Sequence, residues 1–500
     1  MSESREPVSD RAVFAWVIDG LNRRLAEPSG DPKQRRVYNA LRAWIVSGEL
    51  MPDMRLPSSR LLARETDMGR NTALGAIDQL VAEGFLVARE GAGVYVTAVG
   101  FAGLSDTPNA PTSDRLSQRG RAVLAVSPDD AVTHPAFTLG MPALDRFPEA
   151  RWRRVVRRHQ RPGAQQALHY RTHGGHPDLK AAIADYVRLA RGVVCQADQI
   201  LITHGTQQGL GLVATLLADG GDSAWIEDPG YLGARAAFQA ADLRLIPVPV
   251  DDDGLDGSAV ASAHPAPRLI YTTPSNQYPR GVTLALKRRL ALLETARQHE
   301  AWIVEDDYDS ELRYVSSPLA CLQGLAGGAP VIYLGTFSKT LFPALQLGYI
   351  VVPRALISRF RRANARLFRE EDPALQAALA DFMNSGEFAA HIRKMRRCYR
   401  RRQAALREAL APATNAGLRL SSGAAGLHLV AYLDSIAQET RLVDEGAAVG
   451  VSLARLSTYF IGGRTEPGLV LGYAGADEAE IARPGGWLAR AWRASQDDGS

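Results

Sequence analysis

The chain has 500 residues, of which 46% are hydrophobic and 22% are charged, as in ordinary globular proteins. At roughly 150 residues per domain, this length predicts about two to four domains. The net charge of +4 neither demands nor excludes a polyanionic partner, because local patches matter more than the sum. Three dispersed cysteines without a CxxC pair argue against a disulfide framework or a zinc site and fit a reducing cytoplasm. No apolar run approaches the ~20 residues that span a bilayer, and the start MSESREPVSD is not typical of a secretory signal. We therefore expect a cytoplasmic protein with no membrane segment.

The first predicted element is an amphipathic helix over residues 11–27. Proline and glycine interrupt the helical pattern between residues 28 and 32, because neither residue supports a helix interior. We therefore predict that residues 1–32 form a helical extension ahead of a first domain over residues 33–98.

The segment 33–98 has the pattern of a winged helix-turn-helix. A helix over Gln34–Val46 is followed by a short second helix, a tight turn over Thr66–Gly69 and a third helix that begins at Arg70. FLVARE, the glycine turn Gly91–Gly93 and VYVTA then predict a β-hairpin.

In such a motif the second helix of the pair enters the major groove of DNA by its N-terminal end. That end carries Arg70, Asn71 and Thr72; arginine can bond guanine bidentately, and asparagine can bond adenine. Arg60 and Arg89 are placed where phosphates or a minor groove would lie. The helix pattern alone leaves open that Arg60 and Arg70 are only solvated surface groups.

Residues 99–133 are rich in glycine, proline, serine, threonine and aspartate, which predicts a linker. Its basic stretch RLSQRGRAV is interpreted as a solvated tether rather than as a DNA contact.

Residues 134–500 alternate short β-rich runs with longer helical patterns, which predicts an α/β domain with a mostly parallel sheet. We place a large domain at about 165–355 and a smaller α+β lobe at about 356–500. The expected strands are Gln199–Thr203, Ser223–Glu227, Leu243–Val250, Arg268–Thr273, Ala301–Asp306, Val331–Thr336 and Leu347–Val352.

Four motifs of this second domain could carry chemistry. THGTQQG (Thr203–Gly209) ends a strand and starts a helix, where backbone N–H groups attract phosphate. EDPGY (Glu227–Tyr231) follows a strand, and VEDDYDSELRY places acids that could bind a metal, cap a helix or pair with a buried cation. Lys339 in YLGTFSKTLFPALQLGY is a candidate Schiff-base amine, although a lone lysine there is more often a surface residue.

Taken together, these segments resemble a known family. RLPSSRLLARETDMGRNTALGAIDQLVAEGFLVAREGAGVYV resembles the GntR-type winged helix, and the four motifs resemble fold-type I pyridoxal-phosphate enzymes. From about residue 34 to about 475 the chain is similar to the MocR family, which fuses a GntR winged helix to an aminotransferase-like domain; TTPSNQYPRG, EDDYDSELRY and GTFSKTLFPAL are close to that family's motifs. The resemblance implies a winged helix-turn-helix followed by a fold-type I transferase-like α/β domain with a smaller C-terminal α+β lobe.

The resemblance also implies that the first domain binds double-stranded DNA. The implied contacts are Arg60, Arg70, Asn71, Thr72, Arg89, Gly91 and Gly93. One departure is Gly69, where the family usually places serine or threonine as a helix cap; its loss weakens the cap by ~0.5 kcal/mol or less.

In the second domain the resemblance implies that pyridoxal 5'-phosphate is the cofactor. Lys339 would form the Schiff base, Asp306 would pair with the pyridinium nitrogen, Tyr308 would bond the ring oxygen, and Tyr231 would stack on the ring. Gly205, Thr206, Gln207 and Thr336 would hold the phosphate, and Asn276 would lie near the ring oxygen.

Two positions depart from the aminotransferase pattern. Gln346 replaces an arginine that grips the phosphate, and an amide cannot reproduce a bidentate guanidinium pair. Val470 replaces an arginine that clamps the substrate carboxylate; Arg455 and Arg464 lie nearby in the sequence.

Three hypotheses follow from these patterns. The first is a cytoplasmic transcription regulator, expected as a homodimer on two half-sites, that senses pyridoxal phosphate and/or an amino compound and retains at most half-transamination chemistry. The second is an aminotransferase with an appended DNA-binding domain. The third is a regulator whose second domain has lost cofactor binding.

Overall fold

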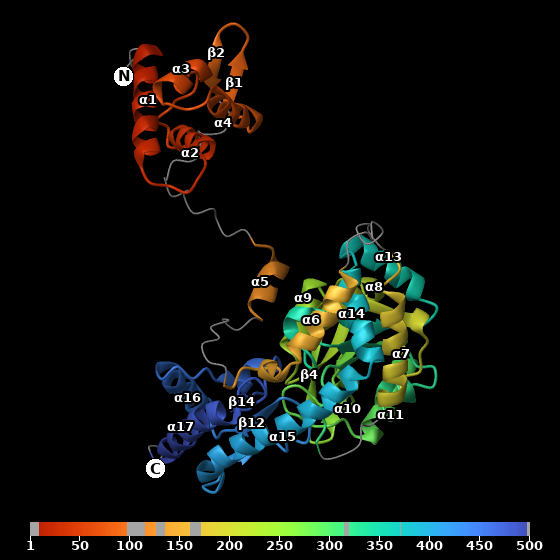
Figure 1. Cartoon of the computed structure of the whole chain (residues 1–500). Coiled ribbons are helices and arrows are strands. Elements are labelled where there is room, and N and C mark those ends of the chain that lie inside the picture. The colour runs from red at the N-terminus through yellow and green to blue at the C-terminus, as the bar shows by residue number, and fades with distance from the viewer. Residues whose placement is uncertain are drawn as a thin grey trace, which may run out of the picture. The chain divides into compact units, whose positions relative to one another are not determined.

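The computed structural model describes residues 10–97, 116–126, 136–160, 172–314, 320–370 and 372–497. The chain divides into two compact units, Met1–Arg115 and Leu116–Ser500, and Figure 1 shows the elements of each. Among the described helices, none combines the length and the hydropathy that crossing a membrane would require.

The first unit is a small helical domain with a two-stranded wing. The strands pair antiparallel from Leu86 opposite Val96 to Arg89 opposite Gly93, as the glycine turn predicts. The elements are α1 (Asp10–Ala26), α2 (Lys33–Val46), α3 (Ser59–Glu65), α4 (Arg70–Ala82), β1 (Leu86–Arg89) and β2 (Gly93–Val96).

Helix α1 shares one hydrophobic core with the winged helix. Val17 and Leu21 of α1 are fully buried in the cluster that contains Leu41 of α2. The rings of Trp16 and Trp44 lie 4.8 Å apart between centroids. The predicted extension is therefore an integral part of this unit, because its apolar stripe is buried in the same core.

The second unit is built on an eight-stranded mixed sheet with the order β3-β10-β9-β8-β7-β4-β5-β6. Its central strands β5, β4, β7, β8 and β9 are parallel, while β10 is antiparallel to both β3 and β9. Each strand run expected from the sequence is present, with ends shifted by at most one residue. The strands are β3 (Ile200–Thr203), β4 (Ser223–Asp228), β5 (Arg244–Asp251), β6 (Gly254–Leu255), β7 (Leu269–Thr272), β8 (Trp302–Asp307), β9 (Val331–Thr336) and β10 (Gly348–Val351).

Helices cover both faces of this sheet, which explains why its central strands are apolar at nearly every position. Val304 of β8 packs in a cluster with α8, α9 and α13, whereas the adjacent Ile303 packs in another with α11. The helices are α6 (Glu149–His159), α7 (Pro177–Arg191), α8 (Gly205–Leu217), α9 (Leu232–Ala240), α10 (Ser258–Ala261), α11 (Leu286–Gln298), α12 (Leu322–Leu325), α13 (Ile357–Leu367) and α14 (Pro373–Asn384).

Most of the predicted linker 99–133 lies outside the described residues, which include only 116–126 of it. Within that stretch Gln118–Leu124 forms helix α5, which contacts α9. This part of the predicted tether is therefore a helix with a packing partner, although its arginines remain exposed to solvent.

The C-terminal lobe combines a long helix with a small antiparallel sheet of order β11-β12-β14-β13, in agreement with the predicted α+β lobe. Its elements are α15 (Glu387–Thr414), β11 (Arg419–Leu420), β12 (His428–Tyr432), α16 (Ile436–Ala448), β13 (Ala454–Arg455), β14 (Gly468–Gly472) and α17 (Glu478–Asp497).

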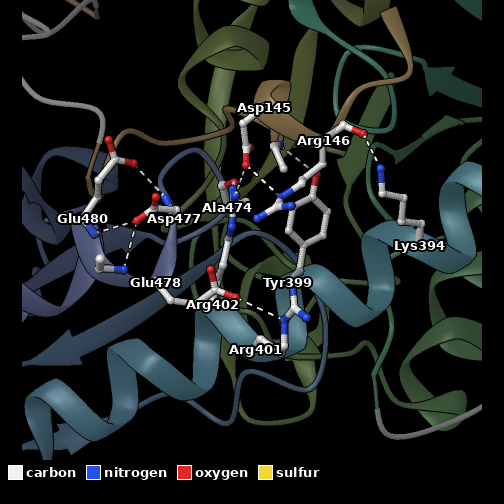
Figure 2. A network of polar contacts seen from close by, with 12 residues as sticks. Asp145, Arg146, Lys394, Tyr399, Arg401, Arg402, Ala474, Asp477, Glu478 and Glu480 are labelled. Atoms are coloured by element: carbon white, nitrogen blue, oxygen red, sulfur yellow. Dashed lines mark hydrogen bonds and ion pairs between the residues drawn. The ribbon is translucent and has the colours of Figure 1, made fainter. Parts of the chain in front are cut away.

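A network of polar contacts fastens residues 143–146 to this lobe (Figure 2). The guanidinium of Arg402, fully buried in α15, pairs with Asp145 at 2.7 Å and donates to the carbonyl of Ala474. The Tyr399 hydroxyl accepts from the backbone N–H of Ala143 at 3.0 Å. These contacts hold the segment that continues into the candidate site.

The burial of α1 in the core predicts that truncating one of its buried side chains destabilises the first unit. Leu21→Ala removes a fully buried side chain and should lower the free energy of unfolding of the first unit by about 2–5 kcal/mol. The measurement is the unfolding transition of this unit in the full chain by urea and circular dichroism. Leu189→Ala is the matched control, since Leu189 is 90% exposed; equal effects of the two substitutions would contradict the shared core.

Candidate functional site

A cavity of about 380 Å³ lies in the second unit at the carboxyl ends of the central strands, the edge where ligands bind in open α/β sheets. It brings together residues predicted from distant motifs. Those in its wall are Gly205, Thr206, Gln207, Tyr231, Asp306, Tyr308, Thr336 and Lys339. Asn276 is not among the lining residues but contacts one of them, Tyr308.

Lys339 lies just past β9, and its amine donates to the carbonyl of Gly140 at 3.1 Å. Burial lowers the pKa of this amine, while Asp309 and Asp306 act in the opposite direction. Gly140 has a φ of +67°, and a side chain there would collide with the Lys339 amine. A desolvated amine with a lowered pKa is suited to nucleophilic chemistry.

Asp306, the penultimate residue of β8, has one carboxylate oxygen engaged and one without a partner among the described residues. Its Oδ2 accepts from the Tyr271 hydroxyl at 2.9 Å, whereas its buried Oδ1 has no hydrogen-bond partner among the described residues. Burial raises the pKa of this carboxyl to about 7, although the Tyr271 hydrogen bond opposes the change. A buried acceptor without a partner is costly, so this oxygen fits a protonated ring nitrogen placed in the cavity.

The three consecutive acids of VEDDYDSELRY, Glu305 to Asp307, have different roles, which the sequence alone did not distinguish. Glu305 accepts from the N–H groups of Leu322 and Gln323 at 2.8 Å each, so it caps the start of α12. Asp307 forms a fully buried pair with Arg191 of α7 at 2.6 Å. Among the residues described, no cluster of histidine, cysteine and acidic side chains is arranged to hold a metal ion.

Tyr308, Asn276 and Asp309 form a chain of hydrogen bonds beside the cavity. The Tyr308 hydroxyl donates to the Asn276 carbonyl at 2.9 Å, and the Asn276 amide donates to Asp309 at 2.8 Å. Asp309 was not predicted as a site residue, although it belongs to an acidic motif that the sequence singles out.

Two more lining residues, Tyr278 and His428, were not predicted. Tyr278 lies within the motif TTPSNQYPRG, whereas nothing in its local sequence marks His428. The Tyr231 and Tyr278 rings meet edge to face with centroids 5.9 Å apart. His428 comes from β12 of the lobe, and its Nε2 lies 2.7 Å from the carbonyl of Pro279. Burial lowers the pKa of His428 to about 4, so its ring is neutral at physiological pH.

The other end of the cavity presents groups suited to a phosphate. Gly205 begins α8 with a φ of +65°, and the first N–H groups of this 13-residue helix are natural anion donors. The hydroxyls of Thr336 and Ser338 lie in the same wall. Gln346 also lines the cavity, and none of the described lining residues is an arginine. This end can therefore bind a phosphate by neutral donors, without a guanidinium.

In the first unit, the N-terminal end of α4 is available to a ligand. Arg70 and Asn71 are exposed, as is Arg60 on α3, and neither arginine forms an ion pair with another described residue. Gly69 occupies the cap position without a side-chain hydrogen bond, as expected from its sequence.

On the wing, Arg89 pairs with Asp53 at 2.5 Å and lies over the Tyr95 ring at 4.3 Å, so it is held rather than free. Gly91 and Gly93 have φ of +71° and +113°, which the tight wing turn requires. Arg55, not predicted, approaches Gly93 closely enough that a Cβ there would lie 2.9 Å from its Nε.

Comparison with known proteins follows the same two-unit division. The model of the bacterial regulatory proteins of the gntR family matches residues 33–96, and that of class I and II aminotransferases matches residues 146–455. The probable rhizopine catabolism regulatory protein MocR of Rhizobium meliloti is 40% identical over 89% of this chain and 91% of its own length.

Two further similar proteins are a transcription regulator and an aminotransferase. The pyridoxine biosynthesis transcriptional regulator PdxR of Corynebacterium glutamicum is 30% identical over 90% of this chain and 94% of its own length. The alpha-aminoadipate aminotransferase LysN of Thermus thermophilus, solved with N-(5'-phosphopyridoxyl)-L-leucine, is 27% identical with a TM-score of 0.67, over 76% of this chain and 96% of LysN.

The raised pKa of Asp306 predicts how pH affects the cofactor-free protein. The folded pKa of about 7 exceeds the value of about 3.9 in an unfolded chain, so the folded state holds this proton more tightly. The stability due to this group is complete below about pH 4 and is lost as pH rises through about 7. Asp306→Asn cannot titrate, so the variant should gain stability relative to the wild type between about pH 5 and about pH 8. Urea unfolding at both pH values measures the difference; a difference independent of pH would refute the assignment.

Proposed function

The chain belongs to the MocR-type family of bacterial transcription regulators, and from that premise we propose that it is a DNA-binding regulator whose second domain senses pyridoxal phosphate and/or an amino compound. The observation that carries the proposal is the presence in one chain of an exposed recognition-helix end at Arg70 and a cavity lined by both Lys339 and Asp306. A ligand in that cavity changes DNA affinity only if it binds two states of the protein with different affinities.

Pyridoxal phosphate would supply a reactive carbonyl carbon and an electron-withdrawing ring. Lys339 would hold that carbon, Asp306 Oδ1 would accept from the ring nitrogen, and Tyr308 would contact the ring oxygen. The backbone of Gly205–Gln207 would hold the phosphate together with Thr336. Asn276 would act through Tyr308, with which it shares two hydrogen bonds.

The DNA contacts are part of the same proposal. Arg70, Asn71 and Thr72 would meet base edges in the major groove, and Arg60 would meet a phosphate. Arg89 would have to exchange its bond with Asp53 for one with the DNA backbone.

We further propose that the regulator acts in the cytoplasm as a homodimer. Fold-type I domains place their cofactor near a subunit interface, and a two-fold dimer would present two winged helices to two half-sites.

An aminotransferase with an appended DNA-binding domain is the second candidate. Lys339 and Asp306 favour it, since they would keep the core of the cofactor chemistry. Val470 and the exposed recognition helix weigh against it as the main role. Repeated turnover of an amino acid with a keto acid at about 1–1000 per second would favour the enzyme; a single half-reaction would not.

DNA binding is tested by electrophoretic mobility shift on the DNA upstream of the protein's own gene. The full chain should bind it specifically, and Arg70→Ala should weaken that binding by about 10- to 100-fold, since a bidentate base contact is lost. Arg23→Ala is the matched control, because Arg23 is 71% exposed and lies on α1. Failure to bind specifically at low and moderate salt would reject the regulator.

Cofactor binding is tested by absorption spectroscopy. The chain mixed with pyridoxal phosphate should show a visible band that Lys339→Ala abolishes, because Lys339 is the one lysine among the described residues that line the cavity. Lys180→Ala is the control, since Lys180 is also buried but lies outside the cavity wall. A protein that stays colourless with added cofactor would support the third hypothesis, in which Gln346 marks a lost site.

A further inference from the structure

The described lining of the cavity contains more acidic groups than basic ones that could hold an anionic ligand. Two buried carboxyl groups, those of Asp306 and Asp309, belong to its wall, and Lys339 contributes the one amine among the described lining residues. That amine is the group expected to hold the cofactor. Neither histidine of the wall supplies a second buried cation, because His204 is exposed and His428 is neutral.

The lobe turns a hydrocarbon surface toward the place where aminotransferases hold their substrate carboxylate. Val470 in β14 is fully buried and packs with Val430, Leu456 and Tyr459. Leu139 and Tyr278 are packed against the same cluster and also line the cavity. The wall behind the cavity is therefore apolar and phenolic at this point.

The arginines near this wall are already engaged. Arg455 lies 3.5 Å from Asp444, and both Arg464 and Arg280 lie 3.5 Å from Glu466. Arg280 also donates to the carbonyl of Val250 at 2.6 Å. Redirecting any of these guanidiniums to a ligand would break contacts that exist in the structure.

The other polar groups of the described lining are hydroxyls, amides, carboxyl groups and imidazole rings, and none of them is a guanidinium. Because His428 Nε2 donates to the Pro279 carbonyl, its Nδ1 carries the lone pair in this tautomer. Among the described residues Asp309 accepts a hydrogen bond from Asn276; burial raises the pKa of its carboxyl group, which keeps acceptor capacity in either protonation state. Hydroxyl and ammonium groups can donate to these acceptors, whereas a ligand carboxylate would be buried near Asp306 and Asp309 with no cation among the described lining residues except Lys339, which is expected to hold the cofactor; burying a charge without a partner is strongly unfavourable.

We propose that the amino compound accepted by this cavity is a primary amine without a carboxylate, whose other polar groups are hydroxyls or further amines. The inference rests on the proposed function, since it names the ligand class of the same sensor site. Lys339 would hold the cofactor's carbonyl carbon and would give up that place to the nitrogen of the incoming amine, whose two hydrogens would pass to the Lys339 nitrogen.

The test compares amines that differ only in a carboxylate. Ethanolamine is paired with L-serine, and putrescine with L-ornithine, each titrated into the full-length chain loaded with pyridoxal phosphate. The readouts are the shift of the visible band and the change in affinity for the upstream DNA. In each pair the carboxylate-free amine should act at a concentration at least about tenfold lower, as expected when an unpaired charge need not be buried.

The outcomes separate this inference from the proposed function. Equal response within each pair, a preference for the amino acids, or a loaded protein whose band responds to none of the four would overturn the inference while cofactor binding stands. Absence of any visible band before amine is added would instead reject cofactor binding itself.

A substitution tests whether the missing guanidinium causes this preference for amines without a carboxylate. Val470→Arg should shift the preference toward L-serine and L-ornithine by supplying the missing guanidinium, and an intact visible band shows that the variant has folded. If Val470→Arg does not fold, His428→Phe provides the second test: it removes an acceptor and should weaken the response to ethanolamine without creating one to L-serine. An unchanged response to ethanolamine in His428→Phe would contradict the assigned role of the ring.

Discussion

The buried ion pair between Arg191 and Asp307 underlies the geometry of the cofactor site. Both side chains are almost completely removed from solvent, and their atoms lie 2.6 Å apart. The same carboxylate accepts from the Tyr333 hydroxyl of β9, and the guanidinium also donates to Ser275. Removing one partner of such a pair typically costs about 3–5 kcal/mol, because the other charge is left buried and unpaired. The pair thus joins α7, β8, β9 and the loop after β7 at the edge of the sheet that carries the cavity.

The neighbouring carboxylate depends on this anchor. Successive residues of a strand point to opposite faces, so fixing Asp307 on one side of β8 orients Asp306 toward the other. There Asp306 has a single hydrogen bond, from Tyr271, and a raised pKa. One acid of the strand end is therefore satisfied within the fold, while the other keeps an acceptor for a ligand.

The departures from the aminotransferase pattern at Gln346 and Val470 both remove positive charge from the site. Both replace a guanidinium with a neutral side chain at the positions where aminotransferases hold anions. What remains is a reactive amine, a partly unsatisfied carboxylate, helix and hydroxyl donors, and a neutral histidine. With the proposed roles, such a site would retain the groups that recognise a pyridine ring and an amine, and would lack the arginines that bind anionic substrates. This composition suits a sensor of amines better than an enzyme that turns over amino acids.

The sequence by itself determined the elements and much of the chemistry. Strand runs such as Val331–Thr336, the helix-turn-helix around Arg70 and the motif residues Lys339 and Asp306 could be recognised because periodicity and motif spacing are local properties of the chain. Tertiary structure alone decided that α1 joins the core of the first unit and that Gly140 meets the Lys339 amine 199 residues away. It also brought His428 from the lobe into the cavity wall and separated the roles of Asp306 and Asp307. These outcomes depend on contacts between residues far apart in the sequence, and no local pattern records which of them the fold will bring together.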